Sequence, residues 1–261
     1  MSRPIAIVTG AARGIGRATA LTLVRGGWSL VASGRSQEEL ASLAAEAEAL
    51  GQTVVPVAGD LREAGTPDAL VAAALTHFGR LDSLINAAGV ARNVPLLDLD
   101  LATWQELFDL HVTATFRCSQ AAARAMVKQG EGGTIVNIGS IASSMAMYTT
   151  GAYAAAKGAV TSLSRVLAVE LAPHKIRVNV VAPGPVATEQ LRKVYDGPKY
   201  AERSRSIPMN RLAEPSEVAD LITFLVSPQA AYITGQVFTI DGGASAVGCY
   251  SYETFKRQEP K

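Results

Sequence analysis

Cysteine and histidine are scarce in this chain. Its 261 residues include two cysteines, Cys118 and Cys249, and three histidines. The two cysteines lie far apart, without a CxxC motif or a Cys/His spacing that could hold zinc. We therefore expect no metal site and a chain that resides in a reducing compartment.

Neither an excess of one charge nor a long apolar run is present. Lys and Arg number 24 and Asp and Glu number 23, for a net charge of +1. The absence of a dense basic run argues against a nucleic-acid partner. No stretch of about 18 uncharged apolar residues occurs, and the N-terminus has no signal-peptide layout. The sequence predicts a soluble cytoplasmic protein that does not bind membranes.

Internal repeats and low-complexity linkers are also absent, so we expect one domain over residues 1–261. Seven short β-branched runs are candidate strands: 5–8, 30–33, 53–58, 83–85, 134–138, 176–181 and 237–240. Most of the intervals between these strands contain apolar residues at helical spacing and are candidate helices: 17–25, 38–50, 68–78, 104–128, 153–171 and 216–226. This alternation predicts an α/β fold, a single doubly wound Rossmann-type domain with a seven-stranded parallel sheet and helices on both faces.

Two segments do not fit the alternation. Residues 183–215 carry prolines at 183, 185, 198 and 208 together with many charges, which predicts an irregular substrate loop. The C-terminal tail, residues 246–261, mixes aromatic and charged residues. It is either a poorly ordered tail or a contact between subunits.

A glycine-rich turn follows the first candidate strand, with Gly10, Arg13, Gly14, Ile15 and Gly16 leading into a helix. Such glycines let the backbone approach a pyrophosphate, which the helix N-terminus then attracts. An ordinary strand-to-helix turn would have similar residues, so nucleotide binding must also be indicated by the residues that follow the later strands.

The end of the second candidate strand reads Ser33-Gly34-Arg35 and has no carboxylate for a ribose 2′-hydroxyl. Arg35, supported by Arg13, could instead pair with a 2′-phosphate. This pattern favours NADP(H) and leaves NAD(H) open, because Arg35 could also be a solvated loop residue.

Two further motifs stand where strands end. Asp60-Leu61 follows the third strand, and the Asp60 carboxylate could accept a hydrogen bond from an adenine amino group. Asn86, Ala87 and Gly89 follow the fourth, where small residues leave room for a ribose. Each alone is typical of a turn or a cap, but successive strand ends are where a dinucleotide crevice forms.

Ser140 follows the fifth strand, and Tyr153 and Lys157 lie four residues apart on the next helix. This spacing places the phenol and the ammonium on one helix face. We expect the nearby cation to lower the tyrosine pKa from its ordinary value of about 10, towards the range useful for proton transfer.

From Ile5 to Gly243 the chain resembles the short-chain dehydrogenase/reductase family, through TGAARGIG, Asp60-Leu61, NAAG, Ser140, YAAAK, Pro183-Gly184 and DGG. The sub-pattern is nearest to the 3-oxoacyl-carrier-protein reductase-like group. The resemblance implies that Ser140 binds the substrate oxygen and that Tyr153 is the proton donor or acceptor. It also implies that Lys157 binds the nicotinamide ribose. Further implied nicotinamide contacts are Pro183, Gly184, Val186 and Thr188.

The family habit implies a homotetramer formed through the helices at 104–128 and 153–171. A widened Tyr–Lys gap, expected for enoyl reductases, is not present. A non-catalytic protein on this fold is expected to lack Ser140, Tyr153 or Lys157, and all three are present.

His111 departs from the family pattern, because many relatives carry Asn there as part of a water-linked proton path. Its ring could fill space, or it could take a catalytic polar role near Lys157, where it would titrate near pH 6.5.

The substrate is expected to be a small carbonyl compound or alcohol, contacted by Ser140, Ala142, Met147, Tyr153 and Gln190. Glu131 lies where carrier-protein reductases place basic residues, which counts against an acidic carrier. The sequence thus predicts an NADP(H)-dependent ketone reductase or alcohol dehydrogenase. The alternatives are an NAD-dependent sugar or polyol dehydrogenase and a 3-oxoacyl-carrier-protein reductase.

Overall fold

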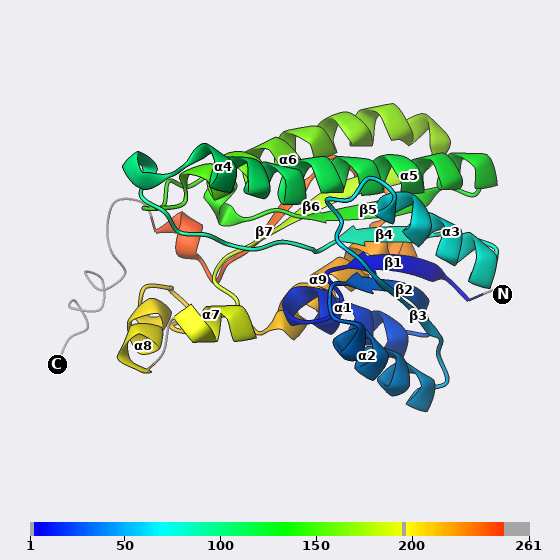
Figure 1. The fold of residues 1–261 in the computed structure, drawn as a ribbon, viewed down its shortest axis with the longest axis horizontal. Coiled ribbons are helices and arrows are strands. Elements are labelled where there is room, and N and C mark those ends of the chain that lie inside the picture. The colour runs from blue at the N-terminus through cyan, green and yellow to red at the C-terminus, as the bar shows by residue number, and fades with distance from the viewer. Residues whose placement is uncertain (1–2, 195–196, 248–261) are drawn as a thin grey trace.

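The computed structural model describes residues 3–194 and 197–247, excluding the side chains of residues 190, 193 and 194. A seven-stranded parallel sheet has the order β3-β2-β1-β4-β5-β6-β7 (Figure 1). The strands are β1 (Ile5–Thr9), β2 (Ser29–Gly34), β3 (Val54–Ala58), β4 (Ser83–Asn86), β5 (Gly133–Ile138), β6 (Ile176–Pro183) and β7 (Val237–Ile240). The predicted fold is confirmed, and each strand lies where the sequence placed it, to within one or two residues.

Helices cover both faces of the sheet (Figure 1). One layer contains α1 (Gly14–Arg25), α2 (Gln37–Ala49) and α9 (Pro215–Val226). The other contains α3 (Thr66–Phe78), α4 (Leu101–Phe108), α5 (Ala114–Gln129) and α6 (Gly151–Leu171). No helix in the described ranges is long and apolar enough to cross a membrane.

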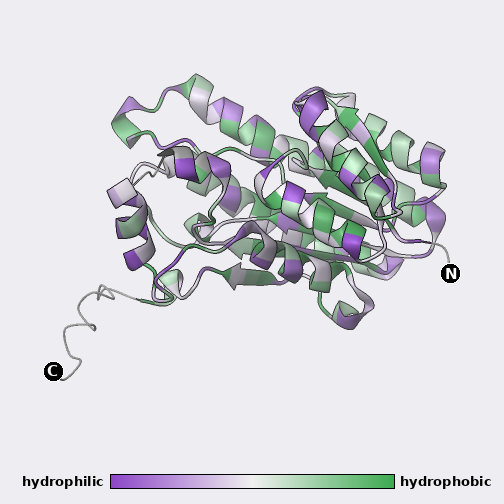
Figure 2. Cartoon of the chain, turned by 90° about the horizontal axis from the view of Figure 1, so that it is seen from below, coloured by the Kyte–Doolittle hydropathy of each residue, from purple (hydrophilic) through white to green (hydrophobic). Residues whose placement is uncertain are grey.

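Each helical layer encloses its own part of the core, because the strands are apolar on both faces. Leu23, Leu40 and Ile222 are buried on the side of α1, α2 and α9. Leu70 and Met126 are buried on the opposite side. Figure 2 shows the resulting pattern, with hydrophobic residues along the sheet and mixed hydropathy on the outer helices.

The predicted helix over 104–128 is two helices joined by a π-helical turn, Asp109–Thr113. The loop at 183–215 is not irregular throughout, since it contains α7 (Glu189–Val194) and α8 (Gly197–Arg205). Pro198 lies in the first turn of α8, where a missing N–H costs no helical hydrogen bond. Tail residues 248–261, including Cys249, lie outside the described residues, whereas Cys118 is a buried free cysteine.

Candidate active site

A cleft of about 1680 Å³ lies at the carboxyl ends of the strands. Segments that follow β1 to β6 contribute to its walls. The strand order reverses between β1 and β4, and such a reversal is where open α/β sheets bind ligands.

The glycine-rich turn between β1 and α1 is built for close backbone approach. Gly10 and Gly14 have φ of +66° and +58°, a region that side chains other than glycine rarely adopt. A Cβ at Gly16 would lie 2.2 Å from the carbonyl oxygen of Gly10. The first N–H groups of α1 lie beside this turn and lack intrahelical acceptors. The turn from Gly10 to Gly16, here called the glycine cradle, therefore fits the pyrophosphate of a dinucleotide.

Basic side chains gather where β2 ends. Arg13 and Arg35 both line the cleft and are exposed. Arg17 also lines it, but its Nη2 is held by Glu46 Oε1 at 2.5 Å. Ser33 is also one of the lining residues, and its buried hydroxyl has no hydrogen-bond partner among the described residues. This end therefore combines cations and an unmatched polar group, which fits a phosphorylated nucleoside.

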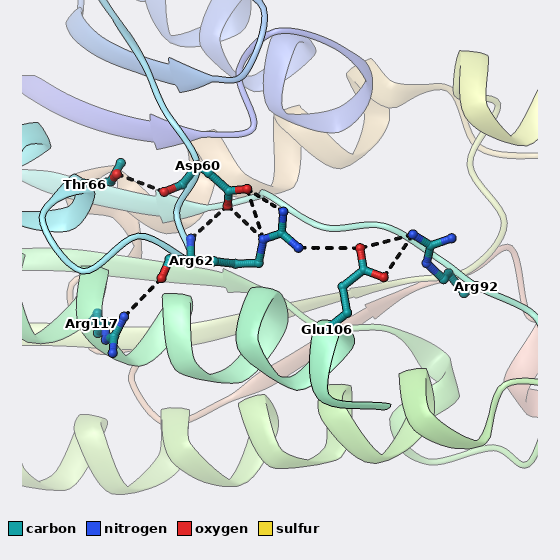
Figure 3. Close-up of polar contacts among 6 residues, drawn as sticks. All are labelled: Asp60, Arg62, Thr66, Arg92, Glu106 and Arg117. Carbon is teal, nitrogen blue, oxygen red and sulfur yellow. Dashed lines mark hydrogen bonds and ion pairs between the residues drawn. The ribbon is translucent and has the colours of Figure 1, made fainter. Parts of the chain in front are cut away.

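Asp60 reaches the cleft but is already engaged by a neighbour. Its carboxylate accepts hydrogen bonds from the Arg62 guanidinium, with an Nη2–Oδ2 distance of 2.5 Å (Figure 3). These bonds hold the pKa of Asp60 below its usual value, although burial opposes the shift. An adenine amino group at Asp60 would share this carboxylate with Arg62. Leu61 lines the cleft beside it.

The side chain of Asn86 is turned inward and is not among the groups that line the cleft. Its amide donates to Asn137 Oδ1 at 2.8 Å and to Ser119 Oγ at 3.1 Å, both inside the core. Asn86 thus ties β4 to β5 and α5, while Ala87 and Gly89 line the cleft.

Ser140, Tyr153 and Lys157 converge at the cleft. Ser140 follows β5, and its hydroxyl lies beside the phenol of Tyr153 in the first turn of α6. Lys157, one turn further on, is buried and donates Nζ–H to the carbonyl oxygen of Ile138 at 2.7 Å. Its Nζ lies 5.7 Å from the centroid of the Tyr153 ring. The three residues form one connected group.

Burial controls the acidity of these groups. It raises the pKa of Tyr153, against the effect of the Ser140 hydrogen bond, and it lowers the pKa of Lys157 to about 8. The expectation that Lys157 lowers the tyrosine pKa is therefore wrong for the free enzyme. Lys157 points at the Ile138 carbonyl, and loss of water around the phenol is the larger effect.

His111 lies in the π-helical turn and is 1% exposed, with its ring nearly perpendicular to the Tyr153 ring at a centroid distance of 5.4 Å. Its Nε2 lies 2.8 Å from the carbonyl oxygen of Val90. Because a carbonyl can only accept, a neutral ring carries its proton on Nε2.

The opposite nitrogen, Nδ1, is buried without a partner among the described residues. Burial and the charge of Lys157 lower the pKa of His111 to about 3, so the predicted titration near pH 6.5 is wrong. His111 is a neutral hydrogen-bond acceptor at the cleft.

Most of the other predicted residues line the cleft where expected, including Ile15 after the glycine turn. Four on the nicotinamide side also do so: Pro183, Gly184, Val186 and Thr188. Ala142 and Met147 are not among the lining residues, and the Gln190 side chain lies outside the description. The sequence analysis missed Arg62 and Glu106, since no motif marks them as cleft residues.

Comparison with known proteins agrees with this geometry. Residues 10–245 match the family model described as "Enoyl-(Acyl carrier protein) reductase". The chain is 39% identical over 245 residues to a 3-oxoacyl-[acyl-carrier-protein] reductase of Synechocystis sp., covering 93% of the chain and 97% of the relative. It is 38% identical over 239 residues to a D-threitol dehydrogenase of Mycolicibacterium smegmatis, covering 92% of each.

Among solved structures, acetoin dehydrogenase from Enterobacter cloacae superposes with a TM-score of 0.87 at 36% identity. The match covers 95% of this chain and 98% of that one. Full-length similarity at these identities, together with the cleft, the glycine cradle and the Ser140–Tyr153–Lys157 group, places the chain in the short-chain dehydrogenase/reductase family of NAD(P)-dependent oxidoreductases.

Proposed function

We propose that the protein transfers a hydride between NADP(H) and a ketone/secondary alcohol pair. The observation that carries this proposal is the phenol of Tyr153, which lies beside the Ser140 hydroxyl and the buried Lys157 in the cleft that holds the glycine cradle. When bound, the nicotinamide ring supplies or accepts the hydride, which is the chemistry that the protein itself cannot perform.

The side chains have separate roles in this proposal. Ser140 orients the substrate oxygen, and the raised pKa of Tyr153 keeps its phenol protonated and able to donate to that oxygen during reduction. Lys157 holds the nicotinamide ribose hydroxyls. His111 offers Nδ1 as a fixed acceptor and takes no part as an acid.

The cofactor is held by the cleft residues between β1 and β6. The glycine turn, from Gly10 to Gly16, binds the pyrophosphate. Asp60, Leu61, Ala87 and Gly89 surround the adenosine. Pro183, Gly184, Val186 and Thr188 would hold the nicotinamide, and Glu189 and Leu191 continue the cleft wall from them.

Arg13 and Arg35 support the choice of NADP(H), because they place two guanidinium groups at the end of β2 where no strand-end carboxylate competes. Glu38 and Glu39 also line this end, which favours NAD(H) as the second candidate. That candidate corresponds to a sugar or polyol dehydrogenase, in line with the similarity to a D-threitol dehydrogenase.

Reduction of a 3-oxoacyl group on a carrier protein is a further candidate, supported by the similarity to 3-oxoacyl-[acyl-carrier-protein] reductases. Glu131 counts against it, although the Glu131 carboxylate lies 2.8 Å from Arg80 and its charge is partly balanced.

The assembly we propose is a homotetramer in the cytoplasm, with helices α4–α5 and α6 at the subunit contacts. Phe116, Val166 and Val169 are 41%, 51% and 76% exposed on these helices, which supports a covered apolar face. Light scattering of the purified protein tests this assembly, and a monomer at working concentration contradicts it.

The proposed reaction is tested by following nicotinamide absorbance, with NADPH and NADH separately for the carbonyl substrates and with NADP⁺ and NAD⁺ separately for the alcohols. The substrate panel contains 3-oxoacyl thioesters, keto sugars, polyols and simple ketones. We expect turnover of a ketone or alcohol, faster with the phosphorylated cofactor, and its loss in Tyr153→Phe without loss of cofactor binding. Full activity of Tyr153→Phe would show that the proton donor is another group.

A further inference from the structure

Arg92 ends a row of four charged side chains along one wall of the cleft (Figure 3). Arg62 links Asp60, at 2.5 Å, to Glu106 on α4, at 3.6 Å. Arg92 Nη2 then contacts both oxygens of Glu106, at 3.1 and 3.0 Å. The charges alternate along this row, and a cation stands at the end away from Asp60.

The guanidinium of Arg92 retains unused donors. Glu106 occupies Nη2 alone, and Nε and Nη1 have no hydrogen-bond partner in the described part of the chain. The side chain is 49% exposed, and Arg92 is one of the residues that line the cleft. Glu106 also contacts Arg62, so it cannot move towards Arg92 without weakening that second pair.

The backbone that carries Arg92 is fixed next to the reacting groups. Two residues before it, Val90 accepts a hydrogen bond from His111, whose ring contacts Tyr153. Two residues after it, the Val94 N–H donates to the Thr149 carbonyl oxygen at 2.8 Å. Two residues of extended chain span at most about 7 Å, so the base of Arg92 stays within that reach of each anchor.

Other cleft-lining cations in the described residues serve the cofactor side. Arg13 and Arg17 follow β1, Arg35 follows β2, and Arg62 follows β3. Lys157 is buried and donates to Ile138. Arg92 differs, because it follows β4 and lies two residues after Val90, which accepts the hydrogen bond from His111 beside Tyr153.

We propose that Arg92, oriented by Glu106, is a specificity-determining residue that binds an acidic group, a carboxylate or a phosphate, on the ketone substrate. This inference rests on the proposed function and narrows its substrate class. A guanidinium that shares one nitrogen with a carboxylate keeps further N–H groups for a second anion. The carboxylate residue Glu189 also lines the cleft, and its negative charge opposes binding of an acid there.

The test compares matched substrates that differ only in the acidic group. Acetoacetate is paired with methyl acetoacetate, and dihydroxyacetone phosphate with dihydroxyacetone, so that the two pairs distinguish a carboxylate from a phosphate. The ratio of kcat/KM for the acid to that for its neutral partner is measured in each variant. Intrinsic reactivity cancels between variants, so a change in the ratio reports the contact alone.

Arg92→Ala is expected to lower this ratio by about tenfold or more for the recognised acid, since a charge-assisted hydrogen bond is lost. Arg92→Lys should restore part of the preference. Arg211→Ala is the matched control, because Arg211 is also 49% exposed and paired with a glutamate, and it does not line the cleft. Melting temperatures verify that each variant is folded.

An unchanged ratio in both Arg92 variants overturns the inference. So does a wild type that reduces the neutral ketones but neither acid, a result that leaves the proposed function standing. Absence of turnover of every ketone and alcohol with either cofactor refutes the proposed function, and the inference falls with it.

Discussion

The buried ammonium of Lys157 should destabilise the free enzyme in a way that depends on pH. Lys157 is buried, and its pKa is lowered from 10.5 to about 8. Below pH 8 both the folded and the unfolded chain hold this proton, and the full cost of burial applies. Between pH 8 and 10.5 only the unfolded chain retains it, so the cost falls as pH rises. From these two pKa values, the cost is about 3 kcal/mol at pH 7 and about 1 to 2 kcal/mol at pH 9.5.

Lys157→Met removes the titrating group while keeping an unbranched side chain. The free energy of unfolding of both proteins is measured in urea at pH 7 and pH 9.5, without cofactor. We expect the variant's stability relative to wild type to fall by about 2 kcal/mol between these pH values. The lost hydrogen bond to Ile138 does not titrate, and other groups cancel between the proteins. A pH-independent difference would refute the lowered pKa.

Three further substitutions test the site. Arg35→Asp should shift the kcat/KM preference from NADPH towards NADH by about 10- to 100-fold, the range for one charge-assisted bond, and an unchanged preference would make Arg35 a solvated loop residue. Gly89→Ala places a Cβ 2.6 Å from His111 Cε1 and should lower stability by about 1–3 kcal/mol in urea unfolding. Gly65→Ala, which meets nothing within 4 Å, is its control, and equal losses would contradict the clash. His111→Gln should reduce kcat/KM but leave its pH profile from 5 to 8 parallel to wild type, because the pKa of His111 is about 3; loss of an inflection near pH 6.5 would show that the histidine titrates.

The sheet could be predicted from the sequence because each strand is a local apolar run between polar turns. The π-helical turn at Asp109–Thr113 could not, since its residues continue the helical pattern on both sides. α8 was missed for a different reason. The prolines and charges of residues 183–215 suggested a loop, although Pro198 lies in the first turn of α8, where a helix tolerates proline.

The candidate site was predictable where residue type alone determines the chemistry. Gly16 belongs to that group, because a Cβ there would meet the carbonyl oxygen of Gly10. Tyr153 was found through the YAAAK motif, which the chain shares with the family. The row of charged residues from Asp60 to Arg92 could not be predicted from the sequence, because it joins three segments that only the fold brings together. The raised pKa of Tyr153 could not be predicted from the sequence either, because it depends on how much water surrounds the phenol.

The π-helical turn allows α4 and α5, which form one continuous helical segment, to present different faces to the rest of the protein. One additional residue within a helix rotates all that follows by about 100°, so the segments on either side need not share a face. On α4, Glu106 lines the cleft wall. On α5, Cys118, Ala122 and Met126 are buried against the sheet. His111 occupies the point of change. The inserted residue thus separates a surface that lines the cleft, on α4, from a surface that packs against the sheet, on α5.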